Sequence, residues 1–202
     1  MTGACVEWGI AQRTAQGQCE SGDFHVIKPT ADGVLLGVLD GLGHGRDAAE
    51  ASRLAAQTIE ANATEPLRSI FRKCHDRLTG TRGVVMSAAR INAAEKTVIW
   101  TGVGNVEAKL FRASSNISPD MEYLLLRSGV VGVNLPLLYV ATMPILPGDL
   151  IIFATDGIRP TFFQEVVRTD PVQKIADTIL VRRIEDNDDA LVLVARYNGQ
   201  KP

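Results

Sequence analysis

The stretch VLLGVLDGLGHG, residues 34–45, joins a nearly unbroken apolar run to a glycine-rich loop. An apolar run of this length suits a β-strand that is covered on both faces. The run ends in one carboxylate, Asp40, and glycines follow it at positions 41, 43 and 45. We therefore expect a strand buried between two layers, with an acid at its end beside a pliable loop.

The rest of the chain consists of blocks of strands and blocks of helices. Apolar residues at helical spacing predict helices over residues 46–63, from Pro66 to about residue 78, and from Pro171 onward. Short β-rich runs predict strands over residues 5–12, 24–29, 34–40, 84–92, 97–103, 106–113, 121–127, 137–143, 149–155 and 190–197.

This order of elements favours an α+β fold. Two antiparallel sheets stacked face to face, with helices on the outer faces, bury the double-sided apolar strands. The sequence shows no internal repeat, low-complexity tract or linker, so we expect a single domain over residues 1–202.

The charge balance excludes one class of partner. The 21 basic and 23 acidic residues give a net charge of −2, which leaves no electrostatic footprint for nucleic acid. Cys5, Cys19 and Cys74 have no CxxC spacing, which argues against a disulfide framework or a zinc site. Reduced thiols and the absence of a signal-peptide pattern predict a cytoplasmic protein.

Residues 129–148 carry no charge and by length alone resemble a membrane span. Pro136, Pro144 and Pro147 interrupt the segment, and several glycines add further breaks. Buried strands broken by turns therefore fit better than a membrane helix. We expect no membrane association.

Four aspartates share an unusual context at the lips of apolar strands. They are Asp23 in ESGDF, Asp40 in VLLGVLD, Asp156 in DLIIFATD and Asp188 in EDNDDALVLV. Buried carboxylates that converge repel one another, and a divalent cation such as Mg²⁺ or Mn²⁺ relieves that repulsion. Glycine after Asp40 leaves room for a ligand near the backbone and frees the Gly41 carbonyl to act as a further ligand. A DG dipeptide is also an ordinary turn, so spacing alone leaves a metal site and a set of simple turns both open.

Several motifs together resemble the metal-dependent Ser/Thr protein phosphatases of type 2C (PPM), in their small SpoIIE-like bacterial branch. The motifs are SGD, DGLGHG, ATDG and NDDALVLV, and they extend over about residues 20 to 195. The stretches RGVVMSAARIN and TGVGNVEAKLF resemble the RsbX-type members of that branch, the stressosome phosphatases. The resemblance implies a four-layer αββα β-sandwich and hydrolysis of phosphoserine or phosphothreonine esters.

The resemblance also implies a ligand set for two Mn²⁺ or Mg²⁺ ions. It consists of Asp23, Asp40, the Gly41 carbonyl, Asp156 and Asp188, with Asp40 as the bridging ligand. The family pattern carries a hydroxyl residue where this chain has Leu191, and the choice between Asp188 and Asp189 rests on the motif alone. We choose Asp188.

A second departure concerns phosphate binding. Larger relatives place an arginine before the first acidic motif, whereas AQGQCES, residues 15–21, contains none. Arg13 is a loose substitute that reads more simply as a surface residue. His44 is the motif's imidazole; it can protonate the leaving alkoxide, cap the following helix or face solvent.

Two functions remain as hypotheses. The first is a phosphatase acting on phosphorylated STAS-domain proteins of a stressosome, which resets a bacterial stress response. The second is a pseudophosphatase that binds a signalling complex without turnover, which the missing hydroxyl and the missing arginine motivate.

Overall fold

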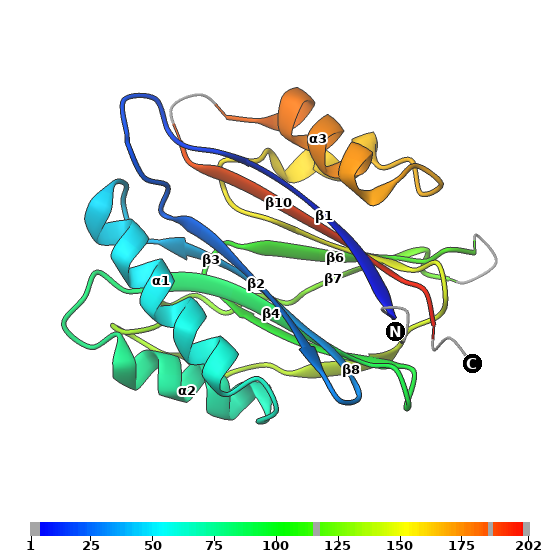
Figure 1. Ribbon diagram of the computed structural model, residues 1–202, viewed down its shortest axis with the longest axis horizontal. Coiled ribbons are helices and arrows are strands. Elements are labelled where there is room, and N and C mark those ends of the chain that lie inside the picture. Colours follow the sequence, from blue (N-terminus) through cyan, green and yellow to red (C-terminus); the bar gives the residue numbers. More distant parts are fainter. Residues whose placement is uncertain (1–4, 115–117, 186–187, 200–202) are drawn as a thin grey trace.

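The computed structural model describes residues 5–114, 118–185 and 188–199. Within these residues, two five-stranded antiparallel sheets pack face to face, with helices on both outer faces (Figure 1). Sheet A contains, in spatial order, β1 (Val6–Arg13), β10 (Ala190–Tyr197), β9 (Leu150–Ala154), β6 (Glu107–Phe111) and β7 (Met121–Tyr123). Sheet B contains β2 (Asp23–Thr30), β3 (Gly33–Gly41), β4 (Val84–Asn92), β5 (Thr97–Val103) and β8 (Ala141–Pro144).

Helices cover the outer face of each sheet. Helices α1 (Arg46–Ala61) and α2 (Leu67–Arg77) lie on sheet B, and α3 (Val172–Arg183) with the short 3₁₀ helix η1 (Pro160–Glu165) lies on sheet A (Figure 1). The predicted α+β class and αββα layering are confirmed. Pro66 and Pro171 directly precede α2 and α3 as their N-cap residues.

The side chains of β3 explain its unbroken apolar run. Leu36 and Val38 pack into the core between the two sheets, whereas Leu35 and Leu39 pack into the core under α1 and α2. Because successive side chains of a strand point to opposite faces, a strand covered twice must be apolar at every position. The strand predicted from VLLGVLD is therefore confirmed, together with its burial on both faces.

Two predicted strands are mostly irregular chain. The strand expected over residues 121–127 ends at Tyr123, and the one expected over 137–143 begins only at Ala141. Gly132 has a positive φ of 102°, and Pro136 lacks the amide hydrogen that a ladder needs, so the intervening segment does not pair regularly. Leu137 in this segment is 84% exposed.

In the described part of the chain, no helix is long and apolar enough to cross a membrane. Residues 115–117, between β6 and β7, lie outside the described residues.

Candidate active site

Two neighbouring strands of sheet B bring the first two predicted ligands together. In the antiparallel ladder of β2 and β3, Asp23 lies directly opposite Asp40. Asp23 is buried, with 1% of its surface exposed, and Asp40 is half-buried. The pairing register thus places two carboxylates side by side at one end of sheet B.

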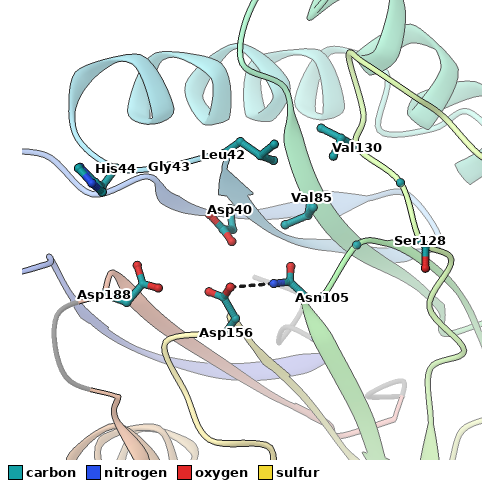
Figure 2. A pocket seen from close by; sticks show the side chains of 12 residues that line it. Asp40, Leu42, Gly43, His44, Val85, Asn105, Ser128, Val130, Asp156 and Asp188 are labelled. Carbon is teal, nitrogen blue, oxygen red and sulfur yellow. Dashed lines mark hydrogen bonds between the residues drawn. The ribbon is translucent and has the colours of Figure 1, made fainter.

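Two neighbouring strands of sheet A position the other two predicted ligands, Asp156 and Asp188. Asp156 lies two residues beyond the end of β9, and Asp188 lies two residues before the start of β10. Because β9 and β10 are antiparallel, with Ala154 opposite Val192, the end of one strand meets the start of the other. Both sheets therefore deliver acids to the same end of the sandwich, where Asp40, Asp156 and Asp188 surround one cavity (Figure 2).

This cavity has a volume of about 570 Å³ and two unlike walls. Its lining consists of Asp40, Leu42, Gly43, His44, Val85, Gly104, Asn105, Ser128, Gly129, Val130, Asp156 and Asp188. The three aspartates form one wall, and the side chains of Leu42, Val85 and Val130 lie on the opposite side (Figure 2). None of these described lining residues is a lysine or an arginine, and Arg13 instead donates a hydrogen bond to the Glu185 carbonyl at 2.6 Å.

We call Asp40, Asp156 and Asp188 the acidic rim of this cavity. Asp23 lies behind this rim and does not line the cavity. Its side chain borders a second cavity of about 480 Å³ together with Gln12, Glu20 and Arg53. The Thr155 hydroxyl donates a hydrogen bond of 2.7 Å to Asp23 Oδ2. Asp23 is thus close enough to Asp40 for electrostatic repulsion. The hydrogen bond from Thr155 connects its carboxylate to sheet A.

The rim carboxylates hold their protons unusually tightly. Burial raises the pKa of Asp40 to about 8, and repulsion from Asp156, Asp188 and Asp189 adds to that shift. Burial and then repulsion from Asp40 raise the pKa of Asp23 well above its usual range. The pKa of Asp156 is raised by burial and by Asp188, against a hydrogen bond from Asn105 that lowers it. A divalent cation among these oxygens offsets the repulsion and favours the ionised forms.

The donor set fits such a cation. Carboxylate oxygens are what Mg²⁺ and Mn²⁺ prefer. Throughout residues 5–114, 118–185 and 188–199, no three His, Cys, Asp or Glu side chains are gathered tightly enough to enclose an ion by themselves. An ion held at this site would keep several of its water ligands, as is usual for Mg²⁺.

The structure separates Asp188 from Asp189. Asp188 is exposed and lines the cavity. Asp189 is buried, and its two carboxylate oxygens accept hydrogen bonds of 2.7 Å from the backbone amides of Ala15 and Gly22. Asp189 thus holds the loop between β1 and β2, which leaves Asp188 as the residue of this motif that faces the cavity.

Gly41 has a structural role that the sequence did not reveal. A Cβ at this position would lie 2.2 Å from the backbone oxygen of Ala48, so only glycine lets α1 pack against the end of β3. Helix packing alone therefore requires glycine here, and the expectation that this glycine also makes room for a ligand stays a prediction. Gly41 is not among the lining residues, and its carbonyl as a ligand stays a prediction.

His44 lies in the cavity wall and is exposed. The N-cap residue of α1 is Gly45, and no side chain caps the helix there. Of the three roles considered for His44, helix capping is therefore wrong. Proton donation and simple exposure stay open.

Sequence reasoning missed two polar residues of the site. Asn105 Nδ2 donates a hydrogen bond of 2.7 Å to Asp156 Oδ2 (Figure 2). No motif of the site drew attention to Asn105, which follows Gly104. Thr155, within the ATDG motif, contacts Asp23 from the other sheet. In both cases one signal in the sequence was available. The polar residue stands directly next to a glycine or an acid at the end of a strand.

Comparison with known proteins gives a consistent result. The family model of Stage II sporulation protein E (SpoIIE) matches residues 30–198. The chain is 24% identical over 190 residues to "Phosphoserine phosphatase RsbX" of Bacillus subtilis (strain 168), with 94% of each chain covered.

Two solved structures match nearly the whole sandwich. A chain from "The bacterial stressosome: a modular system that has been adapted to control secondary messenger signaling" has a TM-score of 0.86 at 29% identity, covering 95% of this chain and 99% of the other. A chain from "Crystal structure of RsbX in complex with magnesium in space group P1" has a TM-score of 0.84 at 24% identity, covering 95% and 94%.

Proposed function

The chain belongs to the SpoIIE family, and from this membership we propose that it is a metal-dependent protein phosphatase that hydrolyses phosphoserine and phosphothreonine esters. We also propose that the whole chain acts as one domain, which the shared apolar core between the two sheets supports. The enzyme works in the cytoplasm.

The observation that carries this proposal is the acidic rim. Strands of both sheets bring Asp40, Asp156 and Asp188 to one cavity, with Asp23 behind them, and no lysine or arginine is among the described residues that line it. Burial, with added repulsion from Asp156, Asp188 and Asp189, raises the pKa of Asp40 to about 8. Such a set is costly to the fold unless it binds cations.

The rim residues would hold two Mn²⁺ or Mg²⁺ ions. Asp40 takes the central place, because it is coupled electrostatically to Asp23, Asp156 and Asp188. The Gly41 carbonyl is the remaining protein ligand. When bound, such ions supply positive charge for the phosphoryl oxygens and acidify water toward neutral pH.

The other lining residues shape the reaction. In the hydrolysis, the bond from phosphorus to the seryl or threonyl oxygen breaks, a bond from phosphorus to a water oxygen forms, and the leaving oxygen takes up a proton. Asn105 holds the Asp156 carboxylate through its amide. The wall of Leu42, Val85 and Val130 limits the water in the cavity. His44 lines the cavity, and its imidazole donates the proton that the leaving oxygen takes up.

We propose phosphorylated STAS-domain proteins of a stressosome as substrates. The relative named phosphoserine phosphatase RsbX and the structural match from a stressosome study support this assignment. Removal of their phosphate resets a bacterial stress response.

The test is phosphate release from a phosphoserine-containing STAS-domain protein by the purified enzyme with Mn²⁺. Asp40→Asn should abolish release while circular dichroism and the thermal transition show an intact fold. Activity that persists in EDTA, or in the Asp40→Asn variant, contradicts the mechanism.

A pseudophosphatase that binds a partner without turnover is the second candidate. The absence of lysine and arginine from the described cavity lining favours it, because nothing cationic in that lining attracts a phosphoryl group. Calorimetry decides between the two. Tight partner binding with negligible Mn²⁺ binding supports the pseudophosphatase.

A further inference from the structure

The carboxylates of the rim are divided between two sheets. Asp23 and Asp40 belong to β2 and β3 of sheet B, whereas Asp156 and Asp188 flank β9 and β10 of sheet A. The core between the sheets is apolar. Apolar contact is not directional, so it does not by itself fix the separation of two sets of oxygens as closely as cation binding requires.

One buried hydroxyl links the two sets directly. Thr155, the residue before Asp156, is 1% exposed. Its Oγ1 accepts a hydrogen bond of 2.8 Å from the Leu191 amide, which ties the end of β9 to the start of β10 within sheet A. The same Oγ1 donates to Asp23 Oδ2 at 2.7 Å, which crosses to sheet B.

Asp189 makes a second link between the two sets, next to the link that Thr155 makes. Its carboxylate accepts the amides of Ala15 and Gly22. The carbonyl of Gly22 in turn accepts hydrogen bonds from the Gly41 amide at 3.1 Å and from the Ser52 hydroxyl at 2.6 Å. The segment that leads into Asp23 is therefore fixed on both sides, and Thr155 supplies the contact to the carboxylate itself.

We propose that Thr155 is a positioning residue for the metal site: its hydroxyl fixes the orientation of Asp23 and the alignment of sheet B's carboxylates with those of sheet A. The inference rests on the proposed function, because it concerns the same cation site. A hydrogen-bond partner of a ligand typically changes metal affinity or activity by about 10–100-fold when it is lost.

The competing explanation is purely structural: Thr155 merely satisfies the buried Leu191 amide. Three variants separate the two explanations. Thr155→Val removes the hydroxyl and keeps the shape, and Thr155→Ser keeps the hydroxyl. Thr101→Val is the matched control, because Thr101 is also buried and donates its hydrogen bond of 2.8 Å to the backbone carbonyl of Tyr139 and not to a carboxylate of the site.

The experiment is titration of each protein with Mn²⁺ by calorimetry, alongside thermal unfolding and the steady-state constants kcat and KM. We expect Thr155→Val to bind Mn²⁺ at least about tenfold more weakly and to lose kcat, with KM little changed. Thr155→Ser should stay within about threefold of wild type. Thr101→Val should lose thermal stability and keep its Mn²⁺ affinity.

Unchanged Mn²⁺ affinity in Thr155→Val overturns the inference and leaves the proposed function standing. If that variant does not fold, a large loss of Mn²⁺ affinity in folded Thr155→Ser overturns the inference in the same way. Wild-type protein that binds no Mn²⁺ overturns the proposed function, and the inference with it.

Discussion

The two ends of strand β9 place acids in opposite surroundings. Asp149, directly before the strand, is fully buried and lies 3.1 Å from the Arg112 guanidinium. The amides of Ala113 and Leu146 donate to the same carboxylate, at 2.8 and 3.0 Å. Asp156, just beyond the other end, has the neutral amide of Asn105 and the repulsion of Asp188.

This difference separates a structural acid from a functional one. At Asp149 the chain supplies its own cation, and Arg112 also pairs with Glu122. At the Asp156 end, carboxylates of both sheets meet, and none of the described residues that line the cavity carries a permanent positive charge. We therefore propose that the converging acids at this end bind a cation.

Asp149→Ala should cause the largest effect, on stability. It leaves the buried Arg112 without this carboxylate and two amides without an acceptor, at a cost of about 3–5 kcal/mol in the free energy of unfolding. Urea denaturation measures the change. The kcat of the remaining folded protein should stay near the wild-type value, and a selective loss of kcat would contradict the structural role of Asp149.

Asp156→Asn applies the matching change to the other end of β9. Loss of a ligand charge should lower Mn²⁺ affinity and turnover by more than about 100-fold, equivalent to about 2.7 kcal/mol. The metal-free protein should be no less stable than wild type, because the substitution removes a repelling charge. Calorimetry and urea denaturation measure the two quantities. A marked loss of metal-free stability would show that Asp156 is a structural acid like Asp149.

The stability of the metal-free protein should fall as the pH rises from about 5.5 to about 8. Over this range folded Asp40 keeps a proton that the unfolded chain has released, because its pKa is raised from 3.8 to about 8. One such group lowers the free energy of unfolding by up to about 1.4 kcal/mol per pH unit, and its effect ends above the folded pKa.

Urea denaturation in EDTA at several pH values measures this slope, and Asp40→Asn should flatten it. Saturating Mn²⁺ should reverse the trend, because cations bind the ionised carboxylates. A wild-type slope unaffected by the Asp40→Asn change would place the titration elsewhere.

Asn105→Ala should have the smallest effect, a loss of about tenfold in turnover or Mn²⁺ affinity, since it removes one hydrogen bond to Asp156. Asn92→Ala is the control. The side chain of Asn92 accepts the amides of Ala94 and Glu95 in an exposed turn, far along the chain from the rim motifs. Equal kinetics for the two variants would remove Asn105 from the site.

Much of the fold was predictable because it depends on local periodicity. The apolar run before Asp40 required a strand covered on both faces, and α1 followed where helical spacing begins. The prediction failed over residues 121–127 and 137–143, where apolar residues alone suggested strands. Gly132 and Pro136 interrupt regular pairing between these two ranges, and Leu137 is exposed.

The sequence by itself determined the residue types of the site: four aspartates at the lips of apolar strands, whose burial creates a charge problem wherever they meet. Only the tertiary structure decided the partners. Thr155 and Asp23 are separated by 132 positions, and Asp189 reaches Gly22 across 167. Such contacts depend on strand register and on how the two sheets stack. These are properties of the whole chain, so the motif could suggest Asp188 as the ligand but could not show that backbone amides hold Asp189 or that α1 requires glycine at position 41.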